Sequence, residues 1–169
     1  MQTEAATLNR APAAANGSNG TLSLALGADA DHMVLTLTVA GQLCGVPALA
    51  VRDVLGPQSI TRIPLAPPEV AGSLNLRGRI VTAIDLRRRL HLAPWEVGTK
   101  PMSVVVEHQG ELYSLLADNV GEVLSLNPAE RAANPPTLDA SWKEVSLGVH
   151  RLGESLLVVL DVERLMRFG

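Results

Sequence analysis

Aromatic residues, paired cysteines and long apolar segments are scarce or absent in this sequence of 169 residues. Only 2% of the residues are aromatic although 47% are hydrophobic, so a core must be built from Val, Leu, Ile and Ala, which suits β-strands better than a ring-lined ligand pocket. A single cysteine, Cys44, excludes an internal disulfide and has no metal-ligand spacing around it, so we expect a small buried apolar residue. No apolar run approaches the ~20 residues of a membrane helix, and no signal peptide begins the chain, which predicts a soluble, cytoplasmic protein without direct membrane insertion.

The charges and polar motifs typical of several other function classes are also missing. The formal net charge of −3 provides no basic face for nucleic acid. No nucleophile-elbow motif and no phosphate-binding loop is present. Asp85 and Asp161 stand where helix N-caps are expected, so capping explains them without catalysis. The four histidines do not have the spacing of metal ligands; they are His32, His91, His108 and His150. His108 and His150 lie in predicted strands and are interpreted as ordinary surface or core residues. We therefore expect no catalytic residues, no metal and no cofactor.

The sequence contains an internal duplication. Leu35-x-Leu37-x-Val39-x-Gly41-x-Leu43 matches Val104-x-Val106-x-His108-x-Gly110-x-Leu112 at an offset of 69 residues. Further along the chain the offset is 76, and it pairs Gly72 with Gly148 and Asp85 with Asp161. A loop can absorb the seven extra residues at small entropic cost. Two copies of about 60 residues are the size of two small subdomains, and the seam between them is a natural place to hold a partner.

Alternating apolar and polar residues predict about five short strands in each half, enough to close a small barrel. We expect residues 1–31 to be a disordered tail, because they are rich in Ala, Asn, Gly and Ser and have no apolar periodicity. Residues 32–169 then form the folded domain, with a first barrel at about 33–92, a second at about 102–160 and a C-terminal helix at 161–168. The pattern predicts an all-β protein of two consecutive barrels.

Some elements are expected from local signals. Pro64 should end a short strand at Ile60–Ile63, and Arg77-Gly78 should form the exposed tip of a hairpin. A short helix, Leu86–Leu90, should carry Arg87-Arg88-Arg89 on a solvated face. In the second half we expect a proline-containing loop at 127–140, then a strand over 144–151.

Three motifs follow one another along the chain and resemble the characteristic segments of one protein family. The run Val46-Pro47-Ala48-Leu49-Ala50-Val51-Arg52-Asp53-Val54-Leu55 resembles the family segment I-P-V-x-x-V-x-E-V-L. Residues 67–81, with Gly72-Ser73-Leu74-Asn75-Leu76-Arg77-Gly78 at their centre, resemble P-x-x-x-x-G-v-x-N-L-R-G-x-i-v. Residues 117–124 resemble V-D-x-V-x-x-V-L. Together these motifs resemble those of the bacterial chemotaxis coupling protein family CheW. The likeness spans residues 33–168, although Leu37 stands where the family often has an aromatic residue and the N-terminal tail is unusually long.

This resemblance implies two intertwined five-stranded barrels of the Src-homology-3-like type with short helices. It also implies a non-enzymatic adaptor that couples transmembrane chemoreceptors (methyl-accepting chemotaxis proteins) to the histidine kinase CheA. The implied partners are the regulatory domain of that kinase and the cytoplasmic hairpin tip of the receptors, with recruitment to membrane-associated receptor arrays. By motif position, the resemblance assigns contacts with kinase or receptor to six residues: Val51, Asp53, Gly72, Asn75, Arg77 and Gly78.

Three alternatives stay open at this point. The protein could serve a chemosensory pathway with an output other than motility. It could be a piece of a larger CheA or CheV protein, but the end of the chain at Gly169 leaves no room for a receiver or kinase domain and favours a stand-alone coupling protein. An enzyme that uses the groove between the barrels is disfavoured, because no acid, base and nucleophile converge in the sequence.

Overall fold

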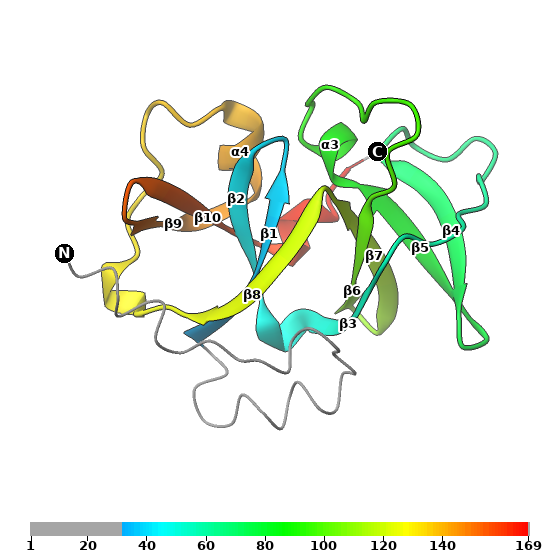
Figure 1. Ribbon diagram of the computed structural model, residues 1–169, viewed down its shortest axis with the longest axis horizontal. Helices are drawn as coiled ribbons and strands as arrows, with labels where there is room; N and C mark the ends of the chain where they lie inside the picture. The colour runs from blue at the N-terminus through cyan, green and yellow to red at the C-terminus, as the bar shows by residue number, and fades with distance from the viewer. Residues whose placement is uncertain (1–31, 169) are drawn as a thin grey trace.

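The computed structural model describes residues 32–168, whose strands form two five-stranded sheets side by side (Figure 1). Sheet one has the order β8-β1-β2-β10-β9, and sheet two has the order β3-β6-β7-β5-β4. The strands of sheet one are β1 (Met33–Val39), β2 (Gln42–Pro47), β8 (Asn119–Ser125), β9 (Ser146–Leu152) and β10 (Ser155–Leu160). Those of sheet two are β3 (Val51–Leu55), β4 (Val70–Leu76), β5 (Arg79–Asp85), β6 (Met102–His108) and β7 (Glu111–Ala117). The predicted tail at 1–31 lies outside the described residues.

Each sheet combines strands from both halves of the sequence. The hairpin β1–β2 of the first half joins β8, β9 and β10, while β3, β4 and β5 join the hairpin β6–β7 of the second half. The two sheets are equivalent under the duplication: the parallel pair Cys44↔Val158 in sheet one corresponds to Tyr113↔Thr82 in sheet two. The barrels are therefore intertwined, and neither of the segments predicted for them, 33–92 and 102–160, forms a five-stranded sheet by itself. Alternation identifies strands, but it carries no information about which strands pair.

The largest core cluster takes residues from both sheets. Leu37 and Val46 of sheet one pack in it together with Ile84 and Val104 of sheet two. Two smaller clusters each belong to one sheet; one is centred on Leu157 and the other on Val81. Cys44 is fully buried in the shared cluster, as predicted, and burial raises the pKa of its thiol. Because the main core is common to both sheets, neither sheet has a complete core of its own.

Loops cover one edge strand of each sheet in equivalent ways. Thr61 and Ser73 of β4 exchange two backbone hydrogen bonds of 2.8 Å, and Ala132 forms the same bridge with Val149 of β9. The predicted strand at 60–63 is reduced to this single bridge, because the prolines that follow cannot donate to a longer ladder. The bridges protect edges that would otherwise present unpaired backbone groups.

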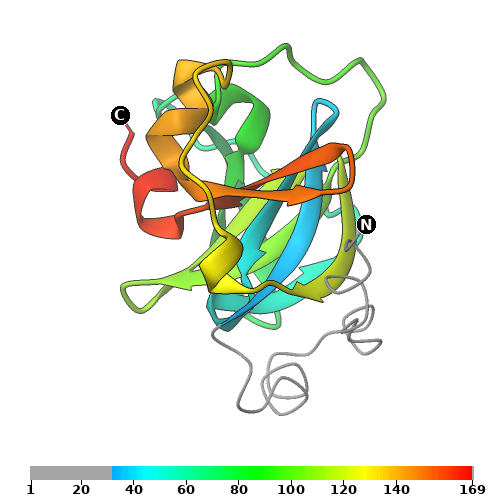
Figure 2. The same ribbon diagram turned by 90° about the vertical axis from the view of Figure 1, so that its left-hand side faces the viewer.

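Short helices close the ends of the sheets (Figure 2). Helices α3 (Leu86–Arg89) and α5 (Val162–Leu165) begin at the predicted caps: Asp85 accepts a hydrogen bond from the Arg88 N–H, and Asp161 from the Glu163 N–H. Helix α5 is shorter than predicted. Helix α4 (Ala140–Val145) occupies the start of the strand expected over 144–151, because Trp142 and Val145, three residues apart, both reach the core. Single turns of 3₁₀ helix lie at η3 (Ala48–Ala50) and η4 (Pro128–Glu130).

Candidate partner-binding site

The tip of the β4–β5 hairpin presents Arg77 to solvent. Arg77 and Gly78 both have positive φ, 51° and 87°, as a two-residue type I′ turn requires. The side-chain Oδ1 of Asn75 accepts a hydrogen bond of 2.9 Å from the Gly78 N–H and fixes the turn. An arginine in the left-handed region costs about 1 kcal/mol relative to the glycine or asparagine that such a turn favours. The predicted tip is confirmed, and Asn75 and Gly78 shape it.

Arg77 pairs with a buried carboxylate. Its Nη1 lies 3.2 Å from Oδ2 of Asp53 on β3; the Arg77 side chain is 73% exposed, whereas that of Asp53 is only 7% exposed. The other carboxylate oxygen, Oδ1, accepts a hydrogen bond of 2.9 Å from the Val54 N–H. Oδ2 is buried and has no partner with hydrogen-bond geometry among the described residues. The ion pair with the exposed Arg77 side chain therefore compensates the negative charge on Oδ2.

The pair lies at the rim of a pocket of about 240 Å³ between the two edges of sheet two. Leu76, Val105 and Leu112 give the pocket an apolar part, and its charged rim is completed by Arg79 and by Arg52, whose Nε lies 2.9 Å from Oε1 of Glu107. Such a surface can receive an apolar side chain and hydrogen-bond its polar neighbours, the combination found at interaction hot spots.

The duplication provides an internal comparison for this site. Positions that keep the fold are the same in both copies, such as Gly72 with Gly148 and Asp85 with Asp161. The arginines of the rim are not repeated, because Arg52, Arg77 and Arg79 correspond to Gly121, Gly153 and Ser155. In total, residues 52–89 contain seven arginines against three carboxylates, in a chain of net charge −3. The fold alone does not require Arg52, Arg77 and Arg79, so these three rim arginines are candidates for function.

The structure does not bring all six predicted residues to this pocket. Asp53 and Arg77 line it, and Asn75 and Gly78 position Arg77. Val51 is 1% exposed and packs in the shared core, so the expectation that it touches a partner does not fit its placement. Gly72 has φ of 150°, and a Cβ there would lie 2.2 Å from the carbonyl oxygen of Thr61. Because Gly72 has no side chain, the loop that contains Thr61 can lie directly against β4.

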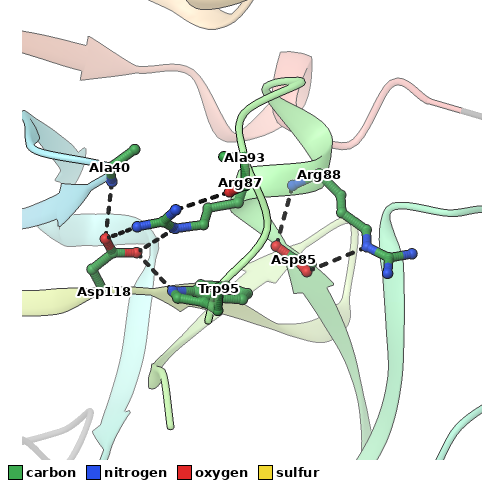
Figure 3. A network of polar contacts seen from close by, with 7 residues as sticks. All are labelled: Ala40, Asp85, Arg87, Arg88, Ala93, Trp95 and Asp118. Carbon is green, nitrogen blue, oxygen red and sulfur yellow. Dashed lines mark hydrogen bonds and ion pairs between the residues drawn. The ribbon is translucent and has the colours of Figure 1, made fainter. Parts of the chain in front are cut away.

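A polar network between the two sheets was not predicted (Figure 3). Asp118, between β7 and β8, accepts hydrogen bonds from the Ala40 N–H, from the Trp95 indole and twice from the Arg87 guanidinium, at 2.6–3.0 Å. Arg87 also lies 5.6 Å from the centre of the Trp95 ring. Burial opposes ionisation of Asp118, but the hydrogen bonds from Arg87, Ala40 and Trp95 outweigh it and lower the pKa of the carboxyl.

The expected solvated arginine face is consequently wrong for two of its three members. Arg87 is held in the network with Asp118, and its side chain is mostly buried. Arg89 is buried and donates to the backbone carbonyls of Leu165, Arg164 and Arg167, which docks α3 on α5. A run of three arginines in the sequence predicts a solvent-exposed helix face. The residues that bind Arg87 and Arg89 lie 31 or more positions away in the sequence, so the local pattern could not reveal them. The only sequence signal was the position of Asp118 within a recognised motif.

Comparison with known proteins decides the family. Residues 33–168 match the family model described as a CheW-like domain. The chain belongs to the CheW family. The chemotaxis protein CheW of Treponema pallidum (strain Nichols) is 28% identical over 141 residues, covering 81% of this chain and 83% of that protein. The chemotaxis protein CheW of Klebsiella aerogenes is 28% identical over 146 residues, covering 86% of this chain and 88% of that protein.

A solved CheW structure has the same fold. The crystal structure of the scaffolding protein TtCheW from Thermoanaerobacter tengcongensis matches this CheW-like chain with a TM-score of 0.72 at 25% identity, over 82% of this chain and 94% of that one. The predicted all-β fold of two intertwined five-stranded barrels is thereby confirmed. Among residues 32–168, no helix of the CheW-like domain could span a membrane. Within the same residues, no three His, Cys, Asp or Glu side chains gather as a metal site would need.

Proposed function

We propose that this protein is a non-enzymatic adaptor that couples chemoreceptors to the histidine kinase CheA in chemotaxis signalling. It would act in the cytoplasm, recruited to membrane-associated receptor arrays, and would bind the regulatory domain of the kinase and the cytoplasmic hairpin tip of the receptors. Family membership and the chemotaxis names of the relatives support this proposal. The structural observation that carries it is the Asp53–Arg77 pair at the rim of a pocket on one sheet.

The geometry of the Asp53–Arg77 pair would allow both side chains to exchange their ion pair for contacts with a helical partner. Arg77 is exposed and held by one ion pair, so its guanidinium can donate to a carboxylate or a helix-terminal carbonyl of a partner. If Arg77 turns toward the partner, Asp53 becomes a buried carboxylate without compensation, which is costly. A partner that also offers a donor to Asp53 removes this cost. Partners without both groups are disfavoured, which makes recognition specific.

Binding titrations test the proposal with the purified full chain, the kinase CheA and a cytoplasmic receptor fragment from the same organism. The parent protein should bind both. Arg77→Asn removes the guanidinium but keeps a residue that favours the turn, and should weaken binding of one partner more than tenfold, about 1.4 kcal/mol or more. Arg151→Asn removes an exposed arginine from β9 of the other sheet and serves as the control. A parent protein that binds neither partner would overturn the adaptor function.

A further inference from the structure

The pocket beside the Asp53–Arg77 pair contains a buried acceptor that the folded chain leaves without a hydrogen bond. Oδ2 of Asp53 has no partner with hydrogen-bond geometry among residues 32–168, although Nη1 of Arg77 lies 3.2 Å away as an ion pair. The other oxygen, Oδ1, already accepts the Val54 N–H. In the second copy the equivalent acid, Glu122, lies at the surface. The duplicated fold therefore does not require a buried carboxylate here, and its free oxygen calls for a ligand that donates to it.

The walls of the pocket favour an apolar side chain as the occupant. Leu76, Val105 and Leu112 line it below the charged rim. Its volume of about 240 Å³ is smaller than the roughly 300–1,000 Å³ of small-molecule and cofactor sites, so it suits one side chain of a protein partner. A short polar side chain, such as serine or asparagine, would leave the apolar walls uncovered. The occupant is therefore mostly apolar and carries one donor.

The charges at the rim disfavour a charged occupant. Nε of Arg52 lies 2.9 Å from Oε1 of Glu107, so these two charges largely offset each other. The side chain of Arg79 is exposed and, within residues 32–168, forms neither an ion pair nor a hydrogen bond. When Arg77 turns toward a partner, the rim has two unpaired cations, which repel a lysine or an arginine. A carboxylate would be brought against Asp53, so a neutral side chain fits best.

Among neutral side chains, an aromatic ring that carries an N–H or O–H group meets both demands. The indole N–H of tryptophan or the phenol O–H of tyrosine can donate to Oδ2 of Asp53 while the ring covers the apolar walls. The guanidinium groups of Arg77 and Arg79 can then lie over the face of the ring. Phenylalanine fits the walls equally well, but it leaves the buried oxygen of Asp53 unpaired, which is costly.

We propose that the pocket between β3 and β4 receives one aromatic side chain of a protein partner, a tryptophan or a tyrosine, whose ring N–H or O–H donates to Oδ2 of Asp53 while Arg77 and Arg79 lie against the ring. The inference rests on the adaptor function, because it names the chemistry of the partner at the site already described. It makes Asp53 a specificity-determining residue, since the site selects a ring with a donor over a ring without one.

Indole and benzofuran are a matched pair of probes for this pocket, because their shapes are nearly the same and only indole has an N–H donor. In NMR titrations of the full chain, indole should shift the amide resonances of Val54 and Leu112 to saturation. Benzofuran should bind about tenfold more weakly or worse, because it leaves the Asp53 oxygen unpaired. Both probes are compared on the parent protein, so this result does not depend on the folding of a variant.

Asp53→Asn should remove the preference for indole. The amide oxygen of the new side chain can still accept the Val54 N–H, but an NH₂ group then replaces Oδ2 and faces the indole N–H donor to donor. Indole and benzofuran should therefore bind this variant equally weakly. The matched control is Glu107→Gln, which changes another carboxylate of the same rim and should keep the preference of the parent.

The partner side chain is identified by competition. Indole at saturating concentration should weaken the binding of either CheA or the receptor fragment to the parent, and benzofuran at the same concentration should not. In that partner, replacement of each tryptophan and tyrosine by phenylalanine in turn should reveal one position at which binding weakens about tenfold or more. Binding to Asp53→Asn should be insensitive to the same replacement, because the hydrogen bond is already lost.

Several results would overturn the aromatic occupant while the adaptor function stands, provided that the parent binds CheA and the receptor fragment. They are a failure of indole to bind, equal binding of the two probes to the parent, and indole binding that weakens neither protein. A parent that binds neither protein overturns the adaptor function, and the assignment of the ring to a partner with it.

Discussion

Nη2 of Arg87 lies 2.6 Å from Oδ2 of Asp118, and this ion pair ties the two sheets together where the chain crosses between them (Figure 3). Arg87 follows β5 of sheet two, and Asp118 lies between β7 of sheet two and β8 of sheet one. Asp118 also accepts the N–H of Ala40, in the turn between β1 and β2. One carboxylate thus fixes a turn of sheet one to a helix that follows sheet two.

Asp118→Ala should lower the free energy of unfolding by about 3 kcal/mol, because it leaves the mostly buried Arg87 guanidinium without its counter-ion. Urea denaturation measures this loss. The matched control is Glu107→Ala, which breaks the more exposed pair with Arg52 and should cost less than about 1 kcal/mol. Equal losses for the two variants would show that the network contributes no more than a surface ion pair.

Gly72→Ala should destabilise the protein by about 3 kcal/mol, because its Cβ would lie 2.2 Å from the Thr61 carbonyl and its φ is positive. Gly78→Ala is the control, since φ is also positive there but no atom lies within 4 Å of the added Cβ. Its cost should be about 1 kcal/mol. Thermal denaturation of both variants checks the difference, and similar melting temperatures would contradict the steric role of Gly72.

Stability should fall as the pH drops from about 7 to 5, because His150 is buried as a neutral side chain. It is 3% exposed, and its Nε2 has no hydrogen-bond partner among the described residues. Burial lowers the pKa of His150, nearby Arg131 lowers it further, and Glu130 opposes them. The unfolded chain, with a histidine pKa of about 6.5, then binds the proton more readily than the folded chain. The contribution of neutral His150 to the free energy of unfolding is therefore complete above the unfolded pKa of about 6.5. It is lost as the pH falls toward the lower pKa of His150 in the folded chain.

His150→Leu isolates this effect, since the equivalent position in the first copy is Leu74, which is also buried. The difference in unfolding free energy between parent and variant should change with pH between about 7 and 5 and be constant above 7. Taking the difference removes other titrations, including that of Asp85, whose pKa is raised by burial. A difference that is independent of pH would show that His150 can be protonated in the folded state without penalty.

Unfolding should be a single cooperative transition, because each sheet contains strands of both halves and the main core is shared. Differential scanning calorimetry should give equal calorimetric and van't Hoff enthalpies. Two resolved transitions would mean that the sheets are stable separately.

Local features of this protein were predictable from its sequence, whereas pairings between distant residues were not. The Arg77-Gly78 tip and the caps at Asp85 and Asp161 depend on a few neighbouring residues, and all three are confirmed. The exchange of strands between the sheets could not be read from alternation, which is the same for either pairing. Arg87 shows the same limit, because its partner Asp118 is 31 residues away.

The candidate site was predicted in part. Motif position identified Asp53 and Arg77 separately, but only the structure shows that they form an ion pair. Motif position also named Val51, but it says nothing of the face on which a side chain lies, and the side chain of Val51 faces the shared core.

Receptor control of kinase activity tests the central claim most directly. A reconstituted mixture of receptor, CheA and this protein should show kinase activity that the receptor stimulus regulates, and Arg151→Asn should behave as the parent does. Arg77→Asn should melt below the parent, because Asp53 loses its ion pair, yet it should stay folded at the assay temperature and lose most of this regulation. Full regulation with Arg77→Asn, or regulation that does not depend on adding the protein at all, would contradict the account.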